Sequence, residues 1–352
     1  MPAPLVIPYF IPHLGCPHQC VFCNQSVITG ETPIDLEARQ ESADIETLIN
    51  EYLGFRKDRE KVEFAFFGGN FLGLPKARIV SLLQGIQPFI EKGEICRIRC
   101  STRPDTVTSD LLDLVSPYGL DLVELGVQSM DDTVLKLSGR GHTKEDTLKA
   151  VQTLKDKGFK VGVQVMVGLP GDTREKAIET AKSLIKLSPD LARIYPALVL
   201  NGSKLAQWYE SGKYTPLNLE VAVSQTKDML VIFERAGVKV VRMGLQASDM
   251  MDDPEQMIAG PWHPAFGHLV FSSLMFDRAC EQINDVLKLS GKGLANPGCI
   301  ELKVHPRSLS RLQGDKKSNI KRLANRYPNL DISIKTDETV NLDRVTAHLS
   351  IV

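Results

Sequence analysis

The chain has 352 residues, enough for one large α/β domain with a smaller appendage or for two ordinary domains. Its 42 basic and 43 acidic residues leave a formal net charge of −1, so no overall field marks a nucleic-acid-binding or membrane-binding protein. The start of the chain lacks the basic and apolar regions of a signal peptide, and no segment is apolar enough to span a bilayer. We therefore expect a soluble cytoplasmic protein.

Short apolar segments alternate with segments of helical periodicity through the first part of the chain. Strands are predicted at residues 5–10, 62–67, 95–101, 122–127, 161–167 and 191–197, and helices at 35–54, 76–92, 109–118, 144–157 and 174–187. Six strand–helix units in a row predict a parallel sheet with right-handed crossovers. Because a closed barrel takes eight strands, we expect a partial (β/α)6 TIM-like barrel, with its chemistry at the C-terminal edge of the strands.

The rest of the chain departs from this alternation. A helix at 219–236 and a strand at 238–243 precede a segment rich in Pro, Gly and Met that begins near residue 250. A helix at 271–289 follows, and then a tail of alternating apolar and basic stretches. We therefore predict a barrel core at residues 1–245, and a crossover with a small α/β subdomain at 246–352.

Three of the seven cysteines, Cys16, Cys20 and Cys23, directly follow the first predicted strand. Clustered cysteines in such a chain indicate a metal site or catalysis. Three thiolates spaced C-x3-C-x2-C can bind three corners of a [4Fe-4S] cluster, which leaves one iron open to the amino and carboxylate groups of a methionine. The alternatives are a zinc site with His18 as a further ligand, and buried structural cysteines.

Glycines and polar residues mark the ends of the next strands. Gly68 and Gly69 end the second strand and would let a ligand approach the backbone, although a tight turn also explains them. Glu124, Gln128 and Gln164 are polar within apolar strands, which predicts a bound ligand or a specific buried partner.

Two more candidate ligand-binding residues, Arg140 and Gly168, lie between a predicted strand and the helix that follows it. Arg140 is either a carboxylate clamp or an ordinary arginine at a helix end. The turn at Gly168, after the fifth strand, suits close packing of the backbone against an adenine ring.

Seven segments together resemble the radical S-adenosylmethionine (SAM) superfamily, in the branch of the catalytic subunit of the elongator complex. The resemblance covers about residues 5–245, and we expect no acetyltransferase domain like the one those subunits carry. The segments are CPHQCVFC (16–23), FFGGNFLGLP (66–75), STRPD (101–105), VELGVQS (123–129), SGRGHT (138–143), KGFKVGVQVMVGLPGDT (157–173) and RIYPALVLNGSKLAQWYESGKYTPL (193–217).

The resemblance implies a role for each matching residue. The three cysteines would hold the cluster, Phe22 would lie against the adenine, and Tyr195 would face the substrate. Asn70 stands where the family more often has a small hydroxyl or acidic residue. The remaining residues implied to bind SAM are Gly68, Gly69, Asn70, Ser101, Glu124, Gln128, Arg140, Gln164 and Gly168.

The resemblance also implies a reaction. A low-potential donor of the flavodoxin or ferredoxin type would reduce the cluster, and cleavage of SAM would give methionine and a 5′-deoxyadenosyl radical that abstracts hydrogen from a substrate. The substrate is expected to be RNA (tRNA or rRNA), because the sibling enzymes act on tRNA.

The basic segment Lys303–Arg326, with Asp315 as its one acid, is either an RNA contact or a solvated helix face. The alternative functions are a coproporphyrinogen-dehydrogenase-like tetrapyrrole enzyme and a non-catalytic iron–sulfur module that binds RNA or haem or senses redox state. Cys280 and Cys299 could hold a second metal, but core or surface cysteines are the simpler interpretation.

Overall fold

The computed structural model describes residues 4–11, 14–24, 41–57, 59–245, 253, 255–289 and 298–350, so the predicted start of the first helix at 35–40 lies outside the described residues. The chain forms two compact units. The first is Met1–Ala222 with Met229–Trp262, and the second is Val223–Asp228 with His263–Val352. The division predicted from the sequence falls at residue 245, whereas the contacts group residues up to Trp262 with the first unit. In the described part, no helix is long and apolar enough to cross a membrane.

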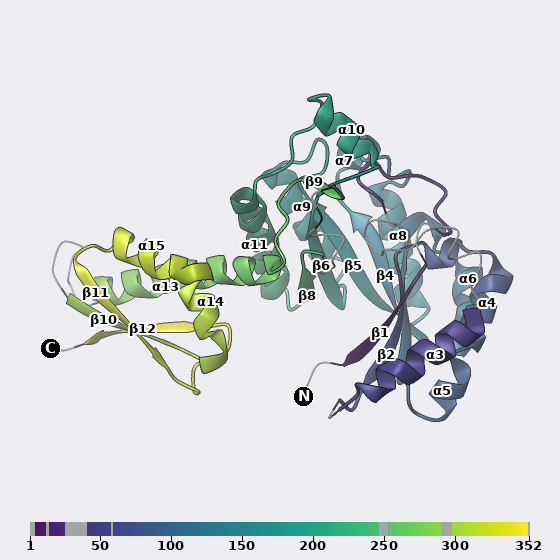
Figure 1. Ribbon diagram of the computed structural model, residues 1–352, viewed down its shortest axis with the longest axis horizontal. Helices are drawn as coiled ribbons and strands as arrows, with labels where there is room; N and C mark the ends of the chain where they lie inside the picture. Colours follow the sequence, from purple (N-terminus) through teal and green to yellow (C-terminus); the bar gives the residue numbers. More distant parts are fainter. Residues whose placement is uncertain are drawn as a thin grey trace. The chain divides into compact units, whose positions relative to one another are not determined.

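A curved sheet of seven parallel strands forms the centre of the first unit (Figure 1). The predicted partial barrel is confirmed, and it extends one strand beyond the six predicted units because β8 pairs in parallel with β6. The sheet order is β1-β2-β3-β4-β5-β6-β8, with strands β1 (Leu5–Phe10), β2 (Val62–Phe67), β3 (Arg97–Thr102), β4 (Leu120–Gln128), β5 (Lys160–Val167), β6 (Leu191–Pro196) and β8 (Lys239–Met243).

Helices pack against this sheet and complete its core. The side chains of Phe64, Phe66 and Phe71 are fully buried, and burial of each such apolar side chain contributes about 1.5–3 kcal/mol. The predicted helix 76–92 is two helices, because Pro88 has no N–H to continue the first one. The helices are α3 (Glu41–Gly54), α4 (Lys76–Gln84), α5 (Gln87–Glu91), α6 (Ser109–Val115), α7 (Asp132–Leu137), α8 (Lys144–Asp156), α9 (Arg174–Ile185), α10 (Lys204–Glu210) and α11 (Leu219–Arg235).

The second unit contains the small α/β fold predicted from the tail. In its sheet, β10 (Gly298–Val304) pairs in parallel with β11 (Leu330–Thr336) and antiparallel with β12 (Val345–Ser350). The helices α13 (Phe266–Leu289), α14 (Leu309–Gln313) and α15 (Ser318–Arg326) bury their apolar sides in one core with this sheet.

Candidate active site

A cavity of about 420 Å³ lies at the carboxyl ends of the strands of the first unit. Alternate residues of one strand face the same side of a sheet, and this periodicity places Glu124 and Gly126 of β4 at the cavity, which Gln128 also lines. The structure brings all predicted site residues to the cavity lining except Asn70 and Gly168. The remaining lining comes from the loop after β1, the ends of β2 and β3, and residues of β5, β6 and β8.

The cysteine loop is anchored by hydrogen bonds just before Cys16 and between Cys20 and Cys23. The Nδ2 of Asn70 donates to the Gly15 carbonyl at 2.7 Å, just before Cys16. Farther along, the Val21 N–H donates to the Ser138 carbonyl at 3.0 Å, and the Val21 carbonyl accepts from the Leu205 N–H at 2.7 Å. The loop is therefore held beside α10 and the segment after α7, and all three cysteines line the cavity.

The three cysteines that line the cavity are the residue type that a [4Fe-4S] cluster requires. Among the described residues, no three His, Cys, Asp or Glu side chains converge as ligands of one metal ion. A zinc ion requires such convergence, at about 2.0–2.3 Å from every ligand, whereas a [4Fe-4S] cubane presents a separate iron to each thiolate. The seven cysteines are free, including Cys280 on α13 and Cys299 on β10.

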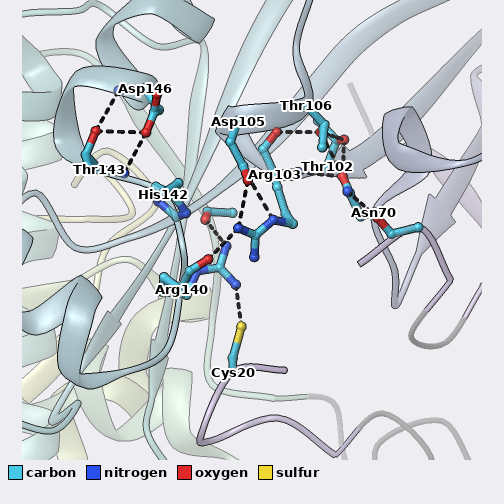
Figure 2. A network of polar contacts seen from close by, with 12 residues as sticks. Cys20, Asn70, Thr102, Arg103, Asp105, Thr106, Arg140, His142, Thr143 and Asp146 are labelled. Carbon is cyan, nitrogen blue, oxygen red and sulfur yellow. Dashed lines mark hydrogen bonds and ion pairs between the residues drawn. The ribbon is translucent and has the colours of Figure 1, made fainter. Parts of the chain in front are cut away.

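Arg140 contacts the cysteine loop directly (Figure 2). Its Nη1 lies 3.0 Å from the Sγ of Cys20, and its Nη2 donates to the Gly126 carbonyl at 2.6 Å. Arg103 is held by Asp105 at 2.9–3.0 Å and donates to the carbonyl of Arg140. Two buried donors, Arg140 Nε and Arg103 Nη1, have no hydrogen-bond partner in the structure. Because unmade buried hydrogen bonds are costly, these groups indicate a polar ligand in the cavity.

Gln128 is a second polar group that lacks a partner. Its Oε1 is buried without a hydrogen bond, and its backbone has φ +65°, a value that a residue other than glycine rarely adopts. A register shift between β4 and β5 lies at this point. Strain of this kind is concentrated at ligand sites, and the bulge aims the amide at the cavity.

Gly69 is required by the fold, whatever ligand it meets. A Cβ at this position would lie 2.2 Å from the Ile11 carbonyl oxygen and 2.8 Å from that of Leu14. The chain entering the cysteine loop therefore passes directly over Gly69. The neighbouring Gly68 has φ +85°, which favours glycine.

The two predicted residues outside the cavity have structural contacts. Asn70 is fully buried, and its Oδ1 accepts from Thr102, Arg103 and Thr106 at 2.6–2.9 Å. Its amide therefore joins the cysteine loop to the end of β3.

Gly168 lines a second cavity of about 460 Å³ together with Asp172 and Tyr214. Its carbonyl accepts from the Tyr214 hydroxyl at 2.6 Å, and its N–H donates to Asp172 at 2.9 Å. Burial raises the pKa of Asp172 to about 6, against the lowering effect of its backbone hydrogen bonds.

Glu124 is the centre of a buried ion-pair network. Its carboxylate accepts from Arg99 on β3 and from Arg193 on β6, and Arg99 also contacts Glu63 at 3.1 Å. Although burial alone has the opposite effect, the Glu124 carboxylate raises the pKa of Arg193. Both Glu124 oxygens accept hydrogen bonds from arginine. The negative charge of this cavity-lining residue is therefore already compensated by the protein.

Three cavity-lining arginines were not among the predicted site residues: Arg103, Arg193 and Arg242. A signal was present in the sequence, because Arg193 interrupts the apolar run of β6 as Glu124 interrupts that of β4. The partners could not be deduced, since they depend on the register of strands far apart in the chain.

Two family models match the chain. The radical SAM superfamily matches residues 10–184, and the radical SAM C-terminal domain matches residues 189–275. An uncharacterised protein of Methanocaldococcus jannaschii is 31% identical over 228 residues, which cover 62% of this chain and 68% of that protein.

Proteins with a named activity also match. A tRNA uridine(34) acetyltransferase of Methanocaldococcus infernus is 31% identical over 243 residues, which cover 59% of this chain and 46% of that enzyme. The chain therefore spans about half the length of that relative. The solved structure of archaeal Elp3 from Methanocaldococcus infernus aligns with a TM-score of 0.60 at 23% identity, over 77% of this chain and 62% of that one, which shows a shared fold.

Proposed function

Because the chain belongs to the radical SAM superfamily, we propose that it is an RNA-modifying enzyme that abstracts hydrogen from a nucleoside of tRNA or rRNA. Its cofactors are those of the superfamily, a [4Fe-4S] cluster and SAM. When bound, they supply one-electron reduction of the sulfonium and a 5′-deoxyadenosyl radical. The observation that carries the proposal is that the three cysteines line one cavity together with unpartnered polar groups.

The residues of the cavity have separable roles in this proposal. Cys16, Cys20 and Cys23 bind the cluster. The unpartnered groups of Gln128 and Arg140 hydrogen-bond to SAM. The other proposed SAM contacts are Phe22, Gly68, Gly69, Ser101, Glu124 and Gln164, and Tyr195 faces the substrate.

Electrons enter near Cys16 in this proposal. Cys16 is exposed, whereas Cys20 is buried, so one side of the cysteine loop is open to a protein partner. A flavodoxin-type or ferredoxin-type donor suits this position, because it delivers one electron at low potential.

The RNA part of the proposal rests on the relatives that act on tRNA and on a basic surface of the second unit. Arg311 and Arg322 stack on Phe271 and Phe276 at 4.3 and 3.7 Å. Lys303 lies within 4.0 Å of acidic side chains, so it is neutralised within the unit. Among the described residues of Lys303–Arg326, the exposed cations without an ion pair are Arg307, Lys316, Lys317, Lys321, Arg322 and Arg326. Of these, Arg322 and Arg326 lie over aromatic rings of the same unit.

The proposal is tested by turnover with RNA. Anaerobically reconstituted enzyme, dithionite and SAM are incubated with total tRNA and, separately, with rRNA, and the digested nucleosides are compared by mass spectrometry. A new nucleoside mass with the parent, and none with a Cys16→Ala/Cys20→Ala/Cys23→Ala variant, is expected. Products that form only with a porphyrinogen would contradict the RNA assignment.

The surface has its own test. The Lys316→Glu/Lys317→Glu variant should weaken RNA binding at least tenfold and reduce the slope of log K against log salt by roughly 1–2. The charge-matched Lys182→Glu/Lys239→Glu variant, with both changes on exposed positions of the first unit, should bind as the parent does. Equal weakening in both variants would show that net charge alone matters.

A further inference from the structure

Two arginines lie side by side at one end of the cavity. Arg193 on β6 and Arg242 on β8 are direct partners in the strand register, and both line the cavity. Like charges in neighbouring positions of a sheet destabilise it unless an anion compensates them. The arrangement therefore calls for negative charge at this point.

Of Arg193 and Arg242, only Arg193 has a carboxylate partner among the described residues. Glu124 is shared by Arg99 and Arg193, and Glu63 is shared by Arg97 and Arg99. These two carboxylates already serve three arginines.

Arg242 is the arginine of this pair that neither Glu124 nor Glu63 contacts. Its Nε donates to the Gly244 carbonyl at 3.2 Å, and no described carboxylate lies within ion-pair distance of it. Burial lowers the pKa of Arg242, and the charge of Arg193 adds to this effect. A half-buried cation in this position is costly without an anionic ligand.

The part of the cavity that contains Arg193 and Arg242 belongs to the opposite edge of the sheet from the cysteine loop. Arg193 and Arg242 are on the last two strands of the sheet, whereas the cysteine loop follows the first strand. The nearby walls are apolar, formed by Leu198, Leu200 and Leu245. The Tyr195 hydroxyl accepts from Arg193 at 3.3 Å, which leaves its own proton available for donation.

We propose that Arg242, assisted by the Tyr195 hydroxyl, binds an oxyanion of the substrate, either a carboxylate or a phosphate. The proposal rests on the proposed function in that the same cavity holds the substrate beside SAM. Arginine suits either group, because its planar fork matches carboxylate and phosphate geometry. In this proposal, the negative charge of the substrate and the C–H bond that is attacked lie in the same cavity.

The test uses the reconstituted holoenzyme with saturating SAM. Thermal unfolding is followed while inorganic phosphate or, in a separate series, acetate is added at constant ionic strength. We expect saturable stabilisation of the parent by one of the two probes, and which one it is identifies the group. Arg242→Gln should weaken that binding at least tenfold, Arg242→Lys should retain part of it, and the exposed Arg235→Gln should match the parent.

Three results would overturn the proposal: no saturable effect of either probe, unchanged binding in Arg242→Gln, or competition between the probe and SAM, which would assign Arg242 to the cofactor carboxylate. Formation of 5′-deoxyadenosine is measured on the same parent preparation. A preparation that cleaves SAM but binds neither probe contradicts this inference alone. One that binds the probe but does not cleave SAM contradicts the proposed function instead.

Discussion

Arg140 and Cys20 are joined by a hydrogen bond, with Nη1 3.0 Å from Sγ, although 120 positions separate them in the chain. Both side chains are buried, so the contact is protected from water. Hydrogen bonds to the sulfurs are one of the factors that set the potential of an iron–sulfur cluster. The guanidinium would stabilise the more negative, reduced cluster.

The first prediction follows from this contact. Arg140→Gln should lower the midpoint potential of the SAM-free cluster by on the order of 60 mV, equivalent to about 1.4 kcal/mol for one electron. The potential is measured by redox titration with electron paramagnetic resonance detection. Arg140→Lys should show a smaller decrease because it keeps the charge, and Arg235→Gln should show none. An unchanged potential in Arg140→Gln would mean that the bond is absent once the cluster is bound.

The second prediction concerns the packing of the cysteine loop over β2. Gly69→Ala should destabilise the protein by about 2–3 kcal/mol and lower its iron content, because the new Cβ meets two backbone carbonyls. Thermal melting and iron analysis measure the two effects. Gly54→Ala is the matched control, because no heavy atom lies within 4 Å of its new Cβ. Equal effects of the two substitutions would rule out the close approach at Gly69.

The third prediction concerns the buried ion pairs. Glu124→Gln removes the buried carboxylate that Arg99 and Arg193 share; Arg99 keeps Glu63, but Arg193 is left without an ion pair, so we expect a loss of about 3–5 kcal/mol in the free energy of unfolding by urea. Asp113→Asn removes the exposed pair with Lys157 and should cost at most about 1 kcal/mol. Similar losses in both variants would show that the Glu124 network contributes no more than a surface pair.

The fourth prediction is a pH dependence at Asp172. Its pKa is raised to about 6, so ionisation is disfavoured in the fold, and stability falls as pH rises from the ordinary value of 3.8 through 6. Asp172→Asn cannot ionise and should be more stable than the parent by about 1–2 kcal/mol at pH 8 after allowance for solvent screening. The difference should vanish below about pH 4. A gap that is independent of pH would assign the effect to packing.

The architecture could be predicted because each strand of the parallel sheet is a short apolar run, as strands buried on both faces are. The helix α10 was not predicted, since its seven residues are too few for a clear periodicity. The spacing of the three cysteines was enough to propose them as cluster ligands from the sequence alone. By contrast, the arginine pair of Arg193 and Arg242 depends on the pairing of β6 with β8, which local sequence does not encode.

Asn70 shows a related limit. Its position after two glycines suggested a cofactor contact, yet its side chain holds Gly15 and the end of β3. These hydrogen bonds give Asn70 a role in the fold that its position in the sequence did not indicate.

The most direct test of the account is an iron and sulfide count on anaerobically reconstituted protein, followed by an assay for 5′-deoxyadenosine with dithionite and SAM. The account predicts about four irons per chain and 5′-deoxyadenosine from the parent, with neither in the Cys16→Ala/Cys20→Ala/Cys23→Ala variant. Zinc in place of iron, or 5′-deoxyadenosine formation that survives the triple substitution, would contradict it.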